Sequence, residues 1–170
     1  IRLDSPCGLV ANAYVICRGG AVALVDTGFA HTVDQLEAGL AEIGLTLGAV
    51  AAVLYTHTHT DHIGGGGALA DRWRPSEYVW EGTTPAFGDV YAHIEASREP
   101  HDWALRVAGG DAASDHAVAQ LLTRPRPPVR AGGPGRLSRP TPVAFGDTVG
   151  VGPLRFRCVD ARGHDPFHCA

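Results

Sequence analysis

The segment His57-Thr58-His59-Thr60-Asp61-His62 constrains this chain more than any other stretch, because it places four metal-binding side chains within six consecutive residues. An apolar run over residues 50–55 precedes it, and four glycines at 64–67 follow it. Imidazole and carboxylate groups are the usual protein ligands of zinc, and catalytic zinc sites keep one position open for water. The segment therefore predicts a metal site on a short loop between a buried strand and a helix start.

The spacing within this loop predicts which side chains act together. His57 and His59 are two positions apart, so in an extended loop both side chains point the same way and can reach one ion. Asp61 and His62 follow one short turn later and can reach a second ion nearby. Glycines after the loop let the backbone pass close to the site without Cβ clashes. No cysteine lies near the cluster, which disfavours a closed structural site, and the context argues against an unstructured His-rich surface loop.

The rest of the chain predicts strands and helices arranged around this loop. Residues 12–17 and 21–25 flank an Arg-Gly-Gly turn and predict a β-hairpin with two largely buried strands. Residues 32–43 predict a helix that begins with Thr32 and Gln35 as a capping box. A short helix is expected from the glycines to Trp73, and further strands are expected at 50–55, 78–80, 143–145, 148–151 and 154–161. This order predicts an α/β layered domain.

Length and composition predict a single domain over residues 1–170. Within it, residues 82–123 are expected to form a helical insertion, and residues 124–142 a Pro/Arg/Gly-rich linker without regular structure. The chain contains no methionine and ends at Ala170 inside a motif. We therefore expect it to be a fragment that lacks the C-terminal part of a longer protein.

The charge and hydropathy of the chain disfavour two classes of binding partner, nucleic acids and membranes. A net charge of -4 and a pI near 6.1 give no electrostatic case for nucleic acid or an anionic membrane surface. No apolar run reaches the length of a membrane span. Cys17 and Cys158 lie in apolar runs and are expected to be buried free thiols, and the absence of C-x-x-C pairs favours a reducing cytoplasm. A small-molecule substrate is the expected partner, and the oligomeric state is left open.

Three motifs, in order along the chain, resemble those of the metallo-β-lactamase-fold hydrolases. The histidine segment at 57–62 resembles the signature of that family, and Leu24-Val25-Asp26-Thr27-Gly28 resembles its first motif. Gly163-His164 resembles its third motif, and His164-Asp165-Pro166-Phe167-His168 is similar to the form found in the glyoxalase-II-like (hydroxyacylglutathione hydrolase-like) branch. The resemblance runs from about residue 10 to the end, with residues 82–142 outside any motif.

The resemblance implies an αββα sandwich, incomplete in its second half, with the metals at one edge. It implies two zinc ions in the full-length protein, with iron or manganese as alternatives. The implied first-metal ligands are His57, His59 and His164, and the implied second-metal ligands are Asp61 and His62. Asp26 is expected to brace the histidine loop without touching metal, and His168 matches a position that is not usually a ligand. The family's bridging aspartate and last histidine are expected beyond Ala170.

The function expected from these features is a metal-dependent hydrolase that uses metal-activated water on a thioester or ester. Asp61 is the expected catalytic residue, orienting the water and then shuttling its proton. One alternative is a flavodiiron-type redox enzyme on the same fold, although those proteins usually carry glutamate at the position of His59. Another is a non-catalytic binding module, although degenerate members usually lose the histidines that this chain retains.

Overall fold

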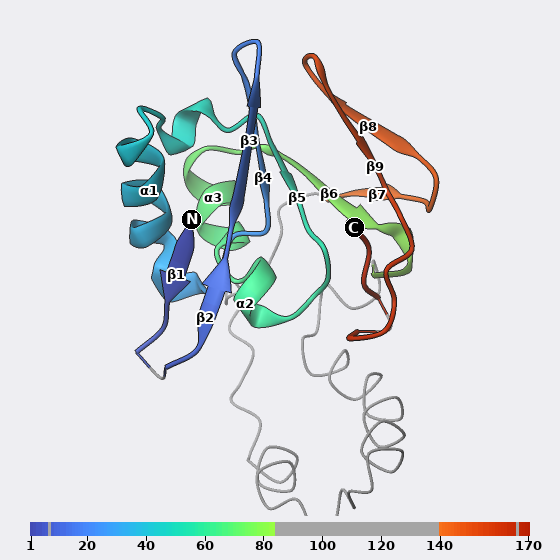
Figure 1. Ribbon diagram of the computed structural model, residues 1–170, viewed down its shortest axis with the longest axis horizontal. Helices are drawn as coiled ribbons and strands as arrows, with labels where there is room; N and C mark the ends of the chain where they lie inside the picture. Colours follow the sequence, from blue (N-terminus) through green and yellow to red (C-terminus); the bar gives the residue numbers. More distant parts are fainter. Residues whose placement is uncertain (7, 84–139, 166) are drawn as a thin grey trace, which may run out of the picture.

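A five-stranded mixed sheet forms the centre of the protein (Figure 1). The computed structural model describes residues 1–6, 8–83, 140–165 and 167–170. The strand order is β3-β4-β5-β6-β7, with β3 antiparallel to β4 and the other neighbours parallel. The strands are β3 (Tyr14–Arg18), β4 (Ala21–Val25), β5 (Ala52–Leu54), β6 (Ser76–Trp80) and β7 (Thr141–Val143).

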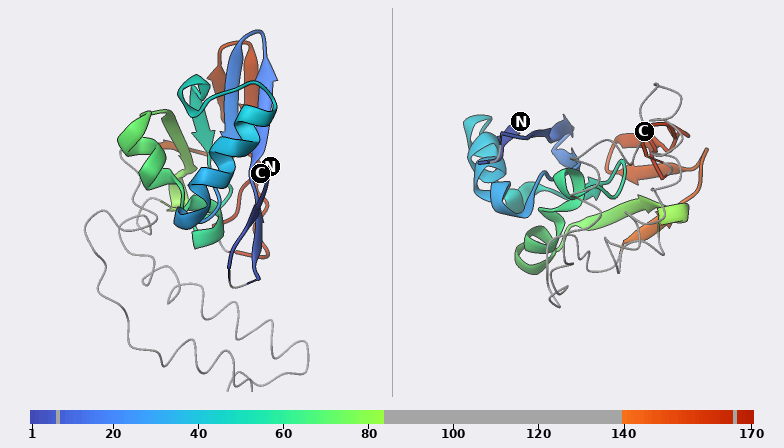
Figure 2. Two further views of the ribbon diagram at one scale, coloured as in Figure 1. Left: turned by 90° about the vertical axis from the view of Figure 1, so that its left-hand side faces the viewer. Right: turned by 90° about the horizontal axis from the view of Figure 1, so that it is seen from below.

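Two antiparallel strand pairs flank this sheet. The first joins β1 (Arg2–Asp4) to β2 (Val10–Asn12), and the second joins β8 (Thr148–Val151) to β9 (Leu154–Arg157). The helical segments are η1 (Ala30–Thr32), α1 (Val33–Glu42), η2 (Leu47–Ala49), α2 (Thr60–Ile63) and α3 (Gly66–Arg72). In the views of Figures 1 and 2, α1 and α3 lie on one side of the sheet and the β8–β9 hairpin on the other.

The two faces of the sheet pack into separate cores because successive side chains of a strand point to opposite faces. Val22 and Leu24 of β4 join the core beneath the helices, together with Leu36 and Leu40 of α1. Ala23, between them in sequence, faces the other way and packs in the core shared with the β8–β9 hairpin. Because β4 and β5 are covered on both sides, they consist of continuous apolar residues, as the sequence predicted.

The predicted hairpin is confirmed, but its burial was predicted incorrectly for the first strand. Tyr14 pairs with Val25 and Arg18 with Ala21, as a hairpin across the Arg-Gly-Gly turn requires. However, β3 is mostly exposed, including Cys17, because it is an edge strand of the sheet. An edge strand has no neighbour on one side, so apolar composition alone did not reveal how much of it faces solvent.

The predicted capping box at the start of α1 is wrong. Thr32 makes no side-chain cap, because it ends the preceding 3-10 turn and its hydroxyl donates to the carbonyl of Phe29 at 3.0 Å. Gln35 instead bonds both backbone groups of Asp4, accepting from its N–H at 2.8 Å and donating to its carbonyl at 2.9 Å. The glutamine therefore ties β1 to α1, a contact that local sequence spacing does not encode.

The predicted linker at 124–142 is also wrong at its end, since residues 141 and 142 belong to β7. Pro142 is tolerated there because β7 has a partner on only one side in the described sheet. The helical insertion and the rest of the linker lie mostly outside the described residues. Within the part of the chain that the structure describes, no helix is both long and apolar enough to cross a bilayer.

A cavity of about 430 Å³ lies between the sheet and the β8–β9 hairpin, with Leu54, Tyr78, Phe156, Cys158 and Cys169 among its lining residues. Cys158 is half-buried rather than fully buried, and the thiol of Cys169 donates to the backbone carbonyl of Tyr55 at 3.5 Å. Burial raises the pKa of the Cys169 thiol to about 12.

Iodoacetamide at pH 8 is expected to alkylate the exposed Cys17 and to leave Cys169 unmodified in the folded protein. A thiol with a pKa of about 12 is ionised to only about one part in 10⁴ at that pH, and the thiolate is the nucleophile. Peptide mass spectrometry reads the two sites separately. Denaturant should release Cys169 for alkylation, whereas equal rates at both sites before unfolding would contradict its burial.

Candidate metal centre

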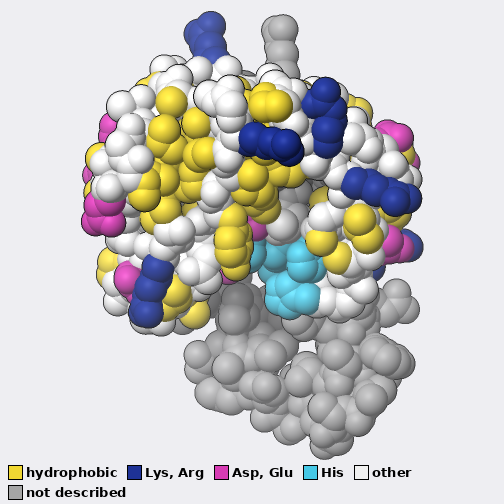
Figure 3. All heavy atoms as spheres, turned by 45° about the horizontal axis from the view of Figure 1, so that its top comes forward, with side chains coloured by type: hydrophobic (Ala, Val, Ile, Leu, Met, Phe, Trp, Pro, Cys, Tyr) yellow, Lys and Arg dark blue, Asp and Glu magenta, His cyan; other side chains and the backbone are white. Residues whose placement is uncertain are grey.

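The histidine loop lies at the edge of the sheet where the parallel strands end. Asp26 follows β4 directly, and Thr56 to His59 follow β5, so the carboxyl ends of two neighbouring strands bring these segments together. Asp26 adopts a left-handed backbone conformation with φ 60°, which aspartate tolerates better than most residues. Figure 3 shows histidine side chains gathered in one patch on this part of the surface.

Asp26 contacts both ends of the loop through its buried carboxylate. One oxygen, Oδ1, accepts from the backbone N–H of Thr56 at 2.9 Å. The other, Oδ2, accepts from the Thr56 hydroxyl at 2.8 Å and lies 2.7 Å from Nδ1 of His62. These contacts place Asp26 where a brace of the loop would lie, since one carboxylate fixes the positions of both residues.

Thr56 sets the orientation of the His57 ring. Because the Thr56 hydroxyl donates its hydrogen to Asp26, its oxygen accepts from Nδ1–H of His57, which lies 2.9 Å away. Nε2 of His57 is then the ring nitrogen without a proton, and it lies 3.1 Å from Nδ1 of His59. The chain of hydrogen bonds Asp26–Thr56–His57 thus leaves an unprotonated nitrogen, the form that can bind a metal, facing the next histidine of the loop.

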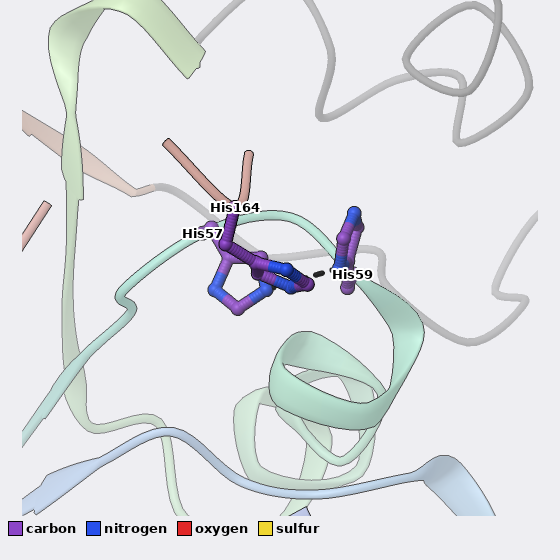
Figure 4. A group of neighbouring side chains, drawn as sticks. All are labelled: His57, His59 and His164. Atoms are coloured by element: carbon purple, nitrogen blue, oxygen red, sulfur yellow. Dashed lines mark hydrogen bonds between the residues drawn. The ribbon is translucent and has the colours of Figure 1, made fainter. Parts of the chain in front are cut away.

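His164 completes a group of three imidazoles with His57 and His59 (Figure 4). One ring nitrogen from each residue lies within 4.8 Å of the other two. The centroid of the His164 ring is 5.2 Å from that of His57 and 5.0 Å from that of His59. Three imidazole nitrogens at these mutual distances form a ligand set of the kind that would hold a zinc ion in a catalytic site. The residues present therefore fit the predicted metal.

Asp61 and His62 pair with each other beside this group. Oδ2 of Asp61 lies 3.4 Å from Nε2 of His62, and this hydrogen bond is the main cause that lowers the pKa of Asp61. Burial opposes ionisation of His62, but its hydrogen bonds to Asp26 and Asp61 outweigh that effect and raise its pKa to about 9. Their assignment to a second ion stays a prediction, because among the described residues only the three histidines form a group of metal-ligating size.

Burial keeps His57 in the neutral form that a metal needs. Burial, followed by repulsion from His62, lowers the pKa of His57 to about 3, so its ring is neutral at physiological pH. His168 lies with its ring centroid 4.6 Å from that of His57, and burial also lowers its pKa. A neutral imidazole is the form that binds metal.

The expectation that glycine permits close backbone approach is confirmed at Gly65. A Cβ placed there would lie 2.7 Å from the backbone oxygen of Thr27, too close for any side chain. The Gly65 N–H donates to the carbonyl of Gly28 at 3.0 Å, and the Thr27 N–H donates to the carbonyl of His62 at 2.8 Å. These bonds fasten the segment after β4 against the end of the histidine loop.

Asp165 is a residue of the centre that the sequence interpretation missed. Its carboxylate is fully buried, with Oδ2 3.0 Å from Nε2 of His59. The motif resemblance pointed to the neighbouring His164 and gave no role to Asp165. The sequence signal that could have found it is its position, an ionisable residue directly after the motif histidine His164. Only the structure shows that this segment folds back onto the histidine loop.

Comparison with known proteins agrees with this arrangement. The sequence matches the metallo-beta-lactamase superfamily over residues 8–169. It is 38% identical over 73 residues to the probable metallo-hydrolase YybB of Bacillus subtilis (strain 168), a match that covers 42% of this chain and 31% of that protein.

Solved structures show the same fold. The metallo-beta-lactamase family protein TTHA1429 of Thermus thermophilus is 26% identical, with a TM-score of 0.66, over 99% of this chain and 52% of that protein. The subclass B3 metallo-beta-lactamase BJP-1 of Bradyrhizobium japonicum is 20% identical, with a TM-score of 0.59, over 92% of this chain and 48% of that protein. This chain therefore spans about half the length of these two structures.

The predicted fold class is confirmed by these matches, and the fold implies binding of a divalent metal at the histidine group. The glyoxalase-II-like branch and the expected truncation stay predictions. Since the family match covers nearly all of the sequence and the three histidines of its motifs converge in space, this chain belongs to the metallo-beta-lactamase superfamily.

Proposed function

We propose that the protein is a zinc-dependent hydrolase of a thioester or ester. The observation that carries this proposal is the convergence of His57, His59 and His164, whose ligand atoms lie within 4.8 Å of one another. When bound at such a group, a zinc ion lowers the pKa of water and polarises a carbonyl oxygen. A second zinc ion, held in part by Asp61 and His62, belongs to the same proposal for the full-length protein.

The residues around the histidine group supply the remaining chemistry. Without a second ion, the hydrogen bond from His62 keeps the pKa of Asp61 below its ordinary value. A second zinc ion in its place would also favour the ionised carboxylate, so Asp61 is an acceptor at neutral pH in either case. In that state it accepts a hydrogen bond from the attacking water and takes up its proton. It then delivers this proton to the departing thiolate or alkoxide, so that one water and one thioester yield an acid and a thiol.

The histidines also favour hydrolysis over the two alternatives. His59 contributes an imidazole to the group, where a carboxylate would suit a diiron redox centre better. The hydrogen bonds Asp26–Thr56–His57 also hold one histidine in a single tautomer, and a non-catalytic module has no need of that. Both features support a hydrolytic centre.

The substrate class rests on the segment 164–168, whose residues are similar to those of the glyoxalase-II-like branch. A small molecule, rather than nucleic acid or a membrane, is the proposed partner, because the net charge of -4 gives no electrostatic case for binding either polyanion. A reducing cytoplasm is the proposed location, supported by Cys158 and Cys169, which are neighbours and yet unpaired.

Removal of metal from the full-length protein is expected to abolish hydrolysis of an acyl-glutathione thioester, and added Zn²⁺ is expected to restore it. The matched oxygen ester and a β-lactam should be assayed in parallel at equal protein concentration. Metal content by elemental analysis completes the experiment, with about two zinc ions per chain expected.

Three results would contradict the proposal in different ways. Hydrolysis of only the β-lactam would refute the substrate class. Iron in place of zinc, together with reduction of oxygen or nitric oxide, would favour the redox alternative. Thioester hydrolysis that is insensitive to a chelator would refute metal dependence.

A further inference from the structure

Asp165 directs a buried carboxylate into the histidine group from the segment that follows β9. Its side chain is 0% exposed, and its two oxygens have different partners. Oδ1 accepts from the backbone N–H of Phe167 at 2.6 Å, within the same turn. Oδ2 lies 3.0 Å from Nε2 of His59, on the loop that follows β5. The local bond shapes the turn, and the distant bond reaches a predicted metal ligand.

The contact with Asp165 determines which nitrogen of His59 carries the proton. An ionised carboxylate only accepts hydrogen bonds, so the His59 nitrogen that faces it must be Nε2–H. In a neutral imidazole the other nitrogen, Nδ1, is then unprotonated and available to a metal. That Nδ1 lies 3.1 Å from Nε2 of His57, the nitrogen that the Thr56 contact leaves without a proton.

With both tautomers fixed in this way, Nε2 of His57 and Nδ1 of His59 face one another across 3.1 Å, and neither nitrogen carries a proton. This arrangement is unfavourable unless a cation or proton lies between or beside them, and His164 adds a third ligand atom to the same region. Asp165 and Thr56 thus act at equivalent places, each fixing the outer nitrogen of one histidine so that the inner nitrogen faces the centre.

We propose that Asp165 is a positioning residue that selects the Nε2–H tautomer of His59 and aims its Nδ1 at the metal. This inference rests on the proposed metal centre but is independent of the substrate. Carboxylates that bond the outer nitrogen of a ligating histidine orient the ring and make it a better donor, and their loss typically weakens metal binding by 10–100-fold.

Asp165→Asn tests this assignment with little change in shape. The Phe167 N–H requires an acceptor at its side of the residue, so the amide oxygen stays there and the amide NH₂ faces His59. The NH₂ then donates to Nε2, which forces the proton of His59 onto Nδ1 and blocks the ligand atom. Zn²⁺ affinity, measured against a competing chelator, is expected to fall by about 10–100-fold.

Asp160→Asn is the matched control, because Asp160 lies in the same segment but is exposed and pairs with Arg162. It is expected to bind Zn²⁺ as the wild type does. A role confined to shaping the turn would lower the melting temperature of the Asp165→Asn variant without changing the tautomer. The ¹⁵N shifts of the His59 ring in metal-free protein therefore decide between the two roles.

Nε2–H in the wild type and Nδ1–H in the variant would support the proposal, together with the loss of Zn²⁺ affinity. Unchanged affinity in the variant, or an Nδ1–H tautomer in the wild type, would overturn it. An Nδ1–H tautomer of His59 would be visible in the wild-type spectrum alone, so this outcome can be tested even if the variant does not fold. Zinc binding without thioester hydrolysis would instead refute the proposed substrate and leave the role of Asp165 intact.

Discussion

Replacing His57 and His59 together by alanine is expected to abolish both zinc binding and hydrolysis in the full-length protein. The two side chains supply two of the three nitrogen atoms that lie within 4.8 Å of one another, and His164 alone cannot hold the ion. We expect hydrolysis to fall by more than about 10³-fold, the upper range for removing a single electrostatic contact from an active site. Zinc content per chain and the rate on an acyl thioester are the two measurements.

Thermal unfolding separates this loss from misfolding. A ligand that binds only the folded state raises the melting temperature, so zinc should stabilise the wild type and leave the double variant unchanged. His31→Ala is a suitable control, since His31 is exposed and pairs with Ser5 rather than with the histidine group. Full hydrolysis in the double variant would contradict the assigned site. Loss of hydrolysis in the His31→Ala control would contradict it too.

The sequence predicted the parts of the fold whose signals are local. Continuous apolar runs predicted β4 and β5, and the Arg-Gly-Gly turn predicted the hairpin, because burial on both faces and tight turns each restrict composition. The short strands β1 and β2 were not predicted, since three residues each carry no readable period. Their pairing and the contact of Gln35 with Asp4 depend on segments that meet only in the folded chain.

The part of the candidate site that the sequence predicted is the part in which a single motif contains several metal-binding side chains. His57 and His59 come from one loop, so spacing alone brought them together, and the family resemblance added His164 from a distant segment. Asp165 was missed because its importance depends on a turn that buries its carboxylate against His59. No pattern within residues 163–168 reveals which side chain of that turn faces the loop.

Asp26→Ala is expected to lower the free energy of unfolding by about 2–4 kcal/mol. The substitution removes the acceptor of three hydrogen bonds, two from Thr56 and one with His62, at a site that is 2% exposed. The range begins at about 2 kcal/mol because the His62 side chain is 25% exposed, so water can replace part of the hydrogen bond that it loses. Alanine also fits the φ of 60° poorly, adding about 1 kcal/mol.

Asp26→Asn separates the charge from the backbone conformation, since asparagine tolerates the left-handed region. Its amide keeps one acceptor for Thr56 but presents NH₂ to either the Thr56 hydroxyl or His62, so we expect an intermediate loss of stability. Asp34→Ala is the matched control, because Asp34 is an exposed carboxylate in the first turn of α1. It should change the free energy of unfolding by no more than about 1 kcal/mol.

The pH dependence of stability in metal-free protein tests the same contact. The pKa of His62 is raised from 6.5 to about 9 in the folded state, so its stabilising contribution is complete below pH 6.5 and is lost as pH rises through 9. Denaturant titrations in this window should show falling stability for the wild type and a shallower slope for Asp26→Asn, in which only Asp61 still raises the pKa. Equal slopes for the two proteins would show that Asp26 does not hold the His62 proton, and the carboxylate would then act on Thr56 alone.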